Sequence, residues 1–170
     1  RSAMSLMAAA FYGHAADKLK IIGITGTNGK TTTSYMLASV LRRAGKAVAV
    51  VGTLGIYYGK KQIAPELTTP DPIFLHKMFA DMLKSGVEYV VAEVSAHALF
   101  YRKEEGISFA ACIFTNFTQD HLDFFNTMEN YKQSKKLLFT PERCPIAVLN
   151  GDDQTGREIG AMRAESDRAG

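Results

Sequence analysis

The sequence predicts an α/β fold, in which helices flank both faces of a mostly parallel β-sheet. Two observations predict it. Five short apolar runs, rich in β-branched residues, recur along the chain, and each is nearly continuous, as in strands covered on both faces. Helical patterns separate most of these runs, and this alternation builds parallel sheets. A chain of 170 residues is long enough for one domain with its own core.

The predicted elements are these, in chain order. An amphipathic helix covers residues 2–12. Strands are expected at 20–25, 47–52, 89–93, 110–115 and 146–150. Helices are expected at 34–44, 72–85 and 128–139. Residues 54–63 look like a small hairpin that turns at 57–60, and residues 66–72 form a loop that contains two prolines. The final stretch, 160–170, is polar and small, with no strand after it.

Composition excludes several classes of protein. Hydrophobic residues make up 46% and charged residues 22%, which is ordinary for a soluble globular protein. The net charge of +3 is mild and argues neither for nor against a nucleic-acid partner; no dense basic block occurs, and we predict none. We expect no signal peptide, and no apolar run in the sequence is long enough to span a bilayer. Cys112 and Cys144 form no metal or redox motif, and Cys112 is predicted to be a buried thiol, so a cytoplasmic location is expected.

The most informative segment is residues 23–33, Gly-Ile-Thr-Gly-Thr-Asn-Gly-Lys-Thr-Thr-Thr. It lies between a predicted strand and a predicted helix. A glycine-rich turn in this position directs backbone N–H groups to one point, at the positive end of the helix dipole. Lys30 adds a positive charge, and the Thr31 hydroxyl can bind magnesium. The segment therefore predicts a P-loop-type site for the phosphates of a nucleoside triphosphate.

The loop departs from the strict P-loop pattern at one position. That pattern requires a glycine five residues before Gly29, where this chain has Ile24. The loop is the shorter form that runs from Gly26 to Thr31. The alternative interpretation is an ordinary strand-to-helix turn, and the two glycines together with the flanking elements favour phosphate binding.

Polar side chains follow the other predicted strands. In open α/β sheets, ligands bind beyond the carboxyl ends of the strands. The residues at those ends are Glu93, Ser95 and His97 after one strand, Asn116, Asp120, His121 and Asp123 after the next, and Asn150, Asp152 and Asp153 after the last. We expect them on the same edge as the phosphate loop.

Three of these features have competing interpretations. Glu93 ends an apolar strand, where a carboxylate is costly unless it binds a metal or is hydrogen-bonded to a neighbouring loop. His121 either binds a metal or caps the following helix, and its acidic neighbours favour the metal. His14 and His76 have no such neighbours and are interpreted as surface residues. Ser95 and His97 resemble a nucleophile and its base, but no glycines flank Ser95, which argues against acyl-enzyme chemistry.

The chain resembles the Mur ligases, ATP-dependent acid–amine ligases of bacterial peptidoglycan assembly, and among them the MurE type. The resemblance covers nearly the whole chain and is highly specific. The segments that carry it are residues 22–33, Leu67-Thr68-Thr69-Pro70-Asp71-Pro72, residues 93–99, residues 114–123, residues 128–131 leading to Lys135, and Asn150-Gly151-Asp152-Asp153. The Thr68-Thr69-Pro70 loop favours the MurE type over other members of the superfamily.

The resemblance implies a reaction and a set of site residues. A carboxylate of UDP-N-acetylmuramoyl-L-alanyl-D-glutamate attacks the γ-phosphate of ATP, and the amine of lysine or diaminopimelate then displaces phosphate from the acyl phosphate. The implied ATP ligands are Gly26, Thr27, Asn28, Gly29, Lys30, Thr31 and Thr32. The implied magnesium ligands are Thr31, Glu93, His121 and Lys135. The implied substrate ligands are Thr68, Thr69, Ser95, Tyr101 and Lys103. The implied catalytic residues are Lys30, Lys135 and His121.

Lys135 is singled out only by the resemblance, because on its predicted helix it is one lysine among several. It matches a family lysine that carbon dioxide carbamylates. The modification makes physical sense, since an ammonium repels magnesium whereas a carbamate is an anion that can bind it.

The chain also departs from the family pattern. A common Ser-Ser-His is Ser95-Ala96-His97 here, and a histidine that often follows the Leu-Asp-aromatic motif is Phe125. A glutamine and an arginine near the substrate are replaced by Tyr101 and Lys103, and Arg102 between them is an alternative replacement for the arginine. Lysine keeps the charge but loses the bidentate fork of arginine, so substrate affinity is the property affected.

The resemblance places all 170 residues in the central ATP-binding domain, as an incomplete copy without the uridine-binding and amino-acid-binding domains. The chain alone is therefore expected to be inactive. Two alternatives remain. One is another ligase of the superfamily, such as a folylpolyglutamate synthetase or an amidotransferase subunit. The other is a P-loop nucleotide-binding module that acts through partners, although no switch segment is evident.

Overall fold

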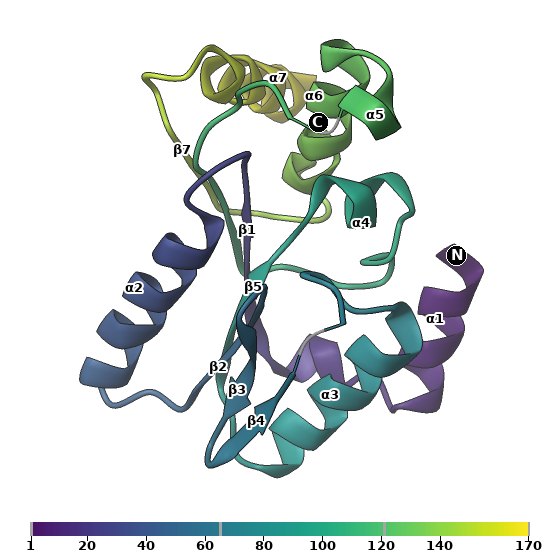
Figure 1. Ribbon diagram of the computed structural model, residues 1–170, viewed down its shortest axis with the longest axis vertical. Helices are drawn as coiled ribbons and strands as arrows, with labels where there is room; N and C mark the ends of the chain where they lie inside the picture. The colour runs from purple at the N-terminus through teal and green to yellow at the C-terminus, as the bar shows by residue number, and fades with distance from the viewer. Residues whose placement is uncertain (1, 65, 121, 170) are drawn as a thin grey trace.

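The computed structural model describes residues 2–64, 66–120 and 122–169. It contains a seven-stranded sheet with the order β4-β3-β2-β5-β1-β6-β7, and helices lie on both faces (Figure 1). The predicted α/β class is confirmed. Strands β2, β5, β1, β6 and β7 are parallel to one another, and the hairpin of β3 and β4 adds two antiparallel strands at one edge.

The strand bounds lie close to the predicted ones. They are β1 Lys20–Thr25, β2 Val48–Gly52, β3 Gly55–Tyr58, β4 Lys61–Ile63, β5 Tyr89–Glu93, β6 Ala111–Phe114 and β7 Ala147–Leu149. β1 lies between β5 and β6, with Ile24 opposite Glu93 and Ile113. The ends of these three strands therefore meet at one edge of the sheet. β7 is an edge strand, and its Val148 is 54% exposed instead of covered on both sides.

Helices cover the two faces unequally (Figure 1). α2 (Lys30–Arg43) packs on one face against β1, β2 and β5. The short helix η1 (Ala15–Lys18) and α3 (Pro72–Lys84) cover the opposite face, and α1 (Ser2–Phe11) packs on α3. The larger core cluster lies on this second face and includes Phe79, Met82 and Phe109.

The remaining helices lie beyond the carboxyl ends of the strands (Figure 1). They are α4 Ala96–Phe100, α5 Leu122–Phe125, α6 Met128–Lys136 with its 3-10 extension η2 Leu137–Phe139, and α7 Gln154–Ala169. α6 and η2 together match the predicted helix at 128–139. These helices place polar residues from distant parts of the sequence above the phosphate loop.

Two sequence-based interpretations need correction, for the start of α2 and for His76, and one helix, α7, was not predicted. α2 begins at Lys30, not at residue 34, because Gly29 adopts a left-handed conformation (φ 84°) that turns the chain into the helix. The polar stretch after residue 153 is the helix α7, whose apolar anchor is Ile159. Its glycines and polar residues weaken the helical pattern. His76 is buried, not at the surface, and its imidazole lies 3.4 Å from the Ser5 hydroxyl.

Other expectations hold within the described residues. The hairpin turns at Gly59-Lys60, inside the predicted segment. Cys112 is a buried free thiol, and so is Cys144. No helix in the described part of the chain is long and apolar enough to cross a membrane.

Candidate nucleotide and substrate site

The phosphate loop joins β1 to α2, as predicted. Gly26 is buried against the strand end of β6, and a Cβ there would collide with the Thr115 hydroxyl. The loop ends at Gly29, where the left-handed backbone leads directly into the first turn of α2. Thr31 and Thr32 lie in that turn, where the backbone N–H groups have no partner inside the helix. An anion can therefore bind at this helix N-terminus.

Two lysines converge on this loop. The Lys30 ammonium donates to the carbonyls of Gly26 (3.0 Å) and Thr27 (2.9 Å). The Lys135 ammonium reaches the same Gly26 carbonyl from α6, at 2.8 Å. The Lys135 side chain is buried, and its Nζ lies 4.5 Å from the centre of the Tyr131 ring. Lys30 and Lys135, which are 105 positions apart in the sequence, thus donate to the same carbonyl oxygen.

Burial changes the protonation of both lysines. It lowers the pKa of Lys30, and the carboxylates of Glu93 and Asp120 partly oppose this. Burial lowers the pKa of Lys135 further, to about 7, and the neighbouring Lys30 charge adds to the effect. A substantial share of Lys135 is therefore the neutral amine near pH 7, and this is the form that can react with carbon dioxide.

Glu93, at the end of β5, faces the phosphate loop and is tightly held. Its Oε2 accepts hydrogen bonds from the hydroxyls of Thr31 and Thr53, each at 3.0 Å, and its Oε1 accepts one from the Thr53 N–H at 3.1 Å. Gly52 makes room for the carboxylate, since a Cβ there would collide with Oε1. A carboxylate has about four lone-pair positions, so one remains for a cation.

The donor set suits magnesium. Thr31 and Glu93 offer oxygen atoms, which hard divalent cations prefer. The Thr31 hydroxyl donates its proton to Glu93, so the lone pairs of the Thr31 oxygen remain available to a cation. No group of three or more His, Cys, Asp or Glu side chains with metal-binding geometry occurs among the described residues. His121, a predicted ligand and catalytic residue, lies outside them.

The loop that follows β6 holds the phosphate loop in place. The Asn116 carbonyl accepts the Thr27 N–H, and the Asn116 side-chain oxygen accepts the Asn28 N–H at 2.9 Å. The Thr115 hydroxyl donates to the Asn28 carbonyl at 2.7 Å. The Asn28 backbone N–H belongs to the predicted phosphate-binding loop, and it already has a partner within the protein.

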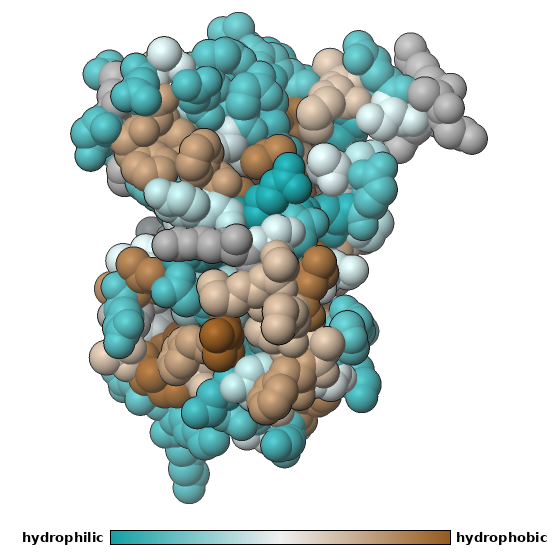
Figure 2. Space-filling model, turned by 90° about the vertical axis from the view of Figure 1, so that its right-hand side faces the viewer, coloured by the Kyte–Doolittle hydropathy of each residue, from teal (hydrophilic) through white to brown (hydrophobic). Residues whose placement is uncertain are grey.

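A cleft of about 530 Å³ begins beside Lys30 and extends along the start of α4. Its lining includes all five predicted substrate ligands, Thr68, Thr69, Ser95, Tyr101 and Lys103, together with Thr53 and His97. Figure 2 shows that the outline of the molecule narrows at mid-height, between an upper and a lower part. The nucleotide loop and the predicted substrate residues thus share one cavity.

Some of these substrate residues already have structural partners. The Thr69 hydroxyl donates to the Glu93 carbonyl and accepts the Ser95 N–H, both at 3.0 Å. Ser95 caps α4 by accepting the Ala98 N–H, and its hydroxyl also lies 3.4 Å from the Thr69 hydroxyl. Lys103 is 5% exposed and pairs with Asp71 at 2.6 Å. Its charge is thus partly neutralised before any ligand binds.

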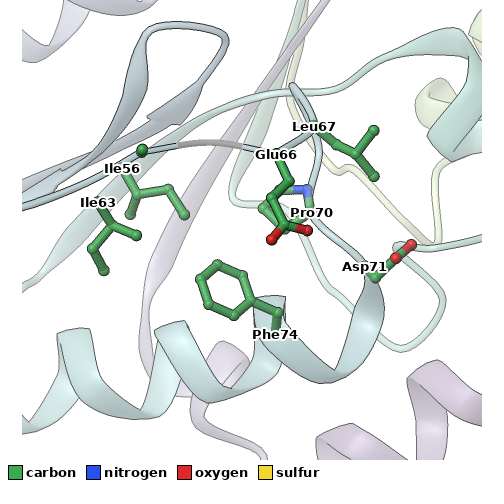
Figure 3. Close-up of a pocket in the computed structure, with 8 residues that line it drawn as sticks. Ile56, Ile63, Glu66, Leu67, Pro70, Asp71 and Phe74 are labelled. Atoms are coloured by element: carbon green, nitrogen blue, oxygen red, sulfur yellow. The ribbon is translucent and has the colours of Figure 1, made fainter.

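The loop at residues 66–71 has an apolar cavity behind it, of about 300 Å³. Figure 3 shows Ile56, Ile63 and Phe74 turned toward this cavity, while Asp71 points away from it. The cavity and the cleft share Leu67 and Asp71 in their linings. Residues 66–71, called the substrate loop below because they include two predicted substrate ligands, therefore separate the cavity from the cleft.

Other polar residues at the strand ends are structural. The Asp153 carboxylate accepts the N–H groups of Phe117, Thr155 and Gly156, which caps α7. The Asn150 side chain donates to the Thr115 carbonyl. The His97 ring, which also lines the cleft, packs against Phe124 with ring centres 4.4 Å apart and ring planes tilted by 49°.

Sequence reasoning missed Thr53 and Gly52, which hold Glu93 in place. Their signal was available in part, because Gly52 ends a predicted strand and Thr53 directly follows it, on the edge where ligands bind. Nothing in the sequence marked them as neighbours of Glu93, because that contact depends on the parallel pairing of β2 with β5.

The fold and the loop between β1 and α2 define a P-loop-type α/β domain. Residues 24–168 match the Mur ligase middle domain, and the chain belongs to the Mur ligase family. It is 48% identical over 159 residues to the UDP-N-acetylmuramoyl-L-alanyl-D-glutamate--2,6-diaminopimelate ligase of Clostridium tetani. That alignment covers 94% of this chain and 32% of the relative.

Solved structures agree on the fold. A structure of UDP-N-acetylmuramoyl-L-alanyl-D-glutamate--2,6-diaminopimelate ligase superposes with a TM-score of 0.84 at 28% identity, covering 97% of this chain and 34% of that one. Mycobacterium tuberculosis folylpolyglutamate synthase, complexed with ADP and AMPPCP, gives 0.75 at 14% identity, covering 98% and 45%. The second likeness concerns the fold alone. The chain thus spans about a third of the length of its ligase relatives.

Proposed function

We propose that the protein carrying this chain is an ATP-dependent ligase that joins a diamino acid, lysine or diaminopimelate, to UDP-N-acetylmuramoyl-L-alanyl-D-glutamate. One observation carries the proposal. Lys30, Thr31, Glu93 and Lys135 meet at the carboxyl edge of the sheet, beside a cleft lined by all five predicted substrate residues. The similarity to diaminopimelate ligases supports diaminopimelate over lysine.

Each group has a proposed role in binding. The loop from Gly26 to Thr32 holds the triphosphate at the N-terminus of α2, and Lys30 swings from the loop carbonyls to the β- and γ-phosphates. Thr31 and Glu93 hold magnesium, together with His121. Magnesium, when bound, neutralises charge on the phosphates that react. Thr68, Thr69, Ser95, Tyr101 and Lys103 position the UDP-sugar peptide in the cleft.

Lys135 is proposed to act as a carbamate. Its lowered pKa supplies the neutral amine that carbon dioxide modifies, and the modification replaces a buried cation with an anion. Held beside the Gly26 carbonyl of the phosphate loop, this anion would add an oxygen ligand to those of Glu93 and Thr31. Tyr131, whose ring lies under the Lys135 side chain, holds it in this direction.

The protein contributes to the reaction mainly by positioning the reactants and neutralising charge. The terminal carboxylate of the substrate attacks the γ-phosphorus, ADP leaves, and an acyl phosphate forms. The amine of the diamino acid then attacks the acyl carbon and phosphate departs. Lys30 neutralises charge on the transferred group, and the cleft keeps the carboxylate beside it.

The test is phosphate release by the full-length protein with ATP, magnesium, UDP-N-acetylmuramoyl-L-alanyl-D-glutamate and diaminopimelate. We expect turnover only when both substrates are present. Lys30→Ala should weaken nucleotide binding sharply, whereas Lys84→Ala, an exposed lysine at the end of α3, should not. Turnover without the sugar peptide, or nucleotide affinity unchanged in Lys30→Ala, would refute the proposal.

Folylpolyglutamate synthesis is the second candidate, because the fold alone also matches that enzyme. The Thr68-Thr69-Pro70 loop in the cleft favours the peptidoglycan substrate. A folate and glutamate arm in the same phosphate-release assay separates the two functions.

A further inference from the structure

Thr53 lies where the metal-binding side of the site meets the substrate loop. Its backbone N–H donates to Glu93 Oε1 at 3.1 Å, and its hydroxyl donates to Glu93 Oε2 at 3.0 Å. The same hydroxyl lies 3.1 Å from the Thr68 hydroxyl. One residue thus contacts both the candidate metal ligand and a candidate substrate ligand.

Counting the hydroxyl protons shows which of Thr53 and Thr68 donates the hydrogen bond between them. A hydroxyl has one proton to donate, and an ionised carboxylate only accepts. The Thr53 proton is used on Glu93 Oε2. The Thr68 hydroxyl must therefore donate to the Thr53 hydroxyl. The result is a relay of two hydrogen bonds, in which Thr68 donates to Thr53 and Thr53 donates to Glu93.

The surrounding structure keeps this arrangement rigid. Gly52 lacks the Cβ that would displace Glu93, which places the Thr53 N–H against the carboxylate. On the other side, the Thr69 hydroxyl ties the substrate loop to the Glu93 carbonyl and the Ser95 N–H. The relay therefore joins two segments that are each anchored to the end of β5.

We propose that Thr53 is a positioning residue, which orients the Glu93 carboxylate for its cation and couples that orientation to the substrate loop through Thr68. The inference rests on the proposed function, because it assumes that Glu93 binds magnesium. Partners that orient a metal ligand commonly change metal affinity about 10-fold or more when they are removed.

The experiment measures Mn²⁺ binding by electron paramagnetic resonance in the full-length protein, with a non-hydrolysable ATP analogue and without turnover. Thr53→Val removes the hydroxyl and keeps the size and the backbone N–H. We expect it to weaken Mn²⁺ binding about 10-fold. Thr53→Ser keeps the hydroxyl and should remain within about twofold of the unmodified protein, a difference well below one hydrogen bond.

The coupling is tested by Thr68→Val in both backgrounds. It should weaken Mn²⁺ binding about threefold when Thr53 is present, of the order expected for one hydrogen bond, and should have no effect in Thr53→Val. A purely structural role would give equal effects in both backgrounds, and that result would overturn the inference. Melting temperatures of all variants identify any that fail to fold, and Thr53→Ala then replaces Thr53→Val.

A reference variant separates the two proposals. If Glu93→Gln abolishes Mn²⁺ binding while Thr53→Val leaves it unchanged, the role of Thr53 is wrong and the proposed function stands. If the unmodified protein binds no Mn²⁺ with the nucleotide, or Glu93→Gln binds it normally, both proposals fail.

Discussion

Glu104 is a buried carboxylate in the turn that follows α4. Its side chain is 1% exposed and lines a small internal cavity with Leu75, Ile107 and Phe109. Neither carboxylate oxygen has a well-formed hydrogen bond within the described part of the chain. Burial raises its pKa to about 7, although its own amide and the charges of Arg143 and Lys103 oppose the shift. At low pH this carboxyl group therefore stays neutral.

The raised pKa predicts how stability changes with pH. An unfolded Glu titrates near 4.5, so the folded state binds the extra proton between about pH 4.5 and 7. The contribution of Glu104 to the free energy of unfolding is fully present below pH 4.5. It is lost as the pH rises through 7, by up to about 3 kcal/mol. Glu104→Leu should remove this loss, so the variant gains stability at pH 8 relative to the unmodified protein.

Urea unfolding at pH 5 and pH 8 measures the effect. Glu88→Gln, at an exposed carboxylate paired with Lys46 at 3.9 Å, is the matched control and should change the pH dependence little. A Glu104→Leu variant that loses as much stability between pH 5 and pH 8 as the unmodified protein would contradict the prediction.

At the scale of elements, α7 is held by an arginine as well as by its apolar face. The Arg163 guanidinium donates to the carbonyls of Phe139 (2.9 Å), Cys144 (2.8 Å) and Pro145 (2.9 Å). Phe139 ends η2, whereas Cys144 and Pro145 lie in the loop before β7, so Arg163 joins the last helix to the segment that enters the edge strand. The Lys132 and Lys136 pairs with Glu158, at 3.1 and 2.7 Å, join α6 to the same helix.

Arg163→Met should destabilise the protein by about 2–3 kcal/mol, because it leaves three carbonyls without their charged donor. Arg157→Met is the control. Arg157 lies on the same helix, is exposed, and donates to the carbonyls of Gly151 and Asp152, so its loss should cost less than about 1 kcal/mol. Equal costs for the two variants in urea unfolding would show that α7 is held mainly by apolar packing.

At the scale of the whole molecule, the cleft is open and reactants must be brought together within it. Ligases that close domains around their substrates gain rate from orientation and from the exclusion of water. The chain spans about a third of its ligase relatives, so the groups that hold the uridine and the diamino acid are proposed to lie in other parts of the protein.

Residues 1–170 alone are therefore predicted to bind magnesium nucleotide weakly and to hydrolyse it slowly, independent of any acceptor. The advantage of orientation that is lost can be worth roughly 7–11 kcal/mol. The measurement is phosphate release by residues 1–170 beside the full-length protein, with both substrates present. Substrate-dependent turnover by the short chain would contradict the prediction.

The sequence by itself determined the parallel strands, most helices and the phosphate loop, because their signals are local. Continuous apolar runs mark buried strands, and a glycine-rich turn before a helix marks an anion site. It also named Lys30, Thr31 and Glu93 as neighbours in function. It did not reveal α7, whose polar sequence masks the buried apolar anchor at Ile159.

Only the tertiary structure decided which side chains meet. Lys135 is one lysine among several on α6 until the fold buries it beside the Gly26 carbonyl. His76 and Glu104 are ordinary polar residues in sequence and become buried through packing of distant elements. Thr53 touches Glu93 because β2 pairs with β5 across 40 residues of chain. Local patterns determine which elements form, whereas contacts between residues far apart in sequence arise only when those elements pack.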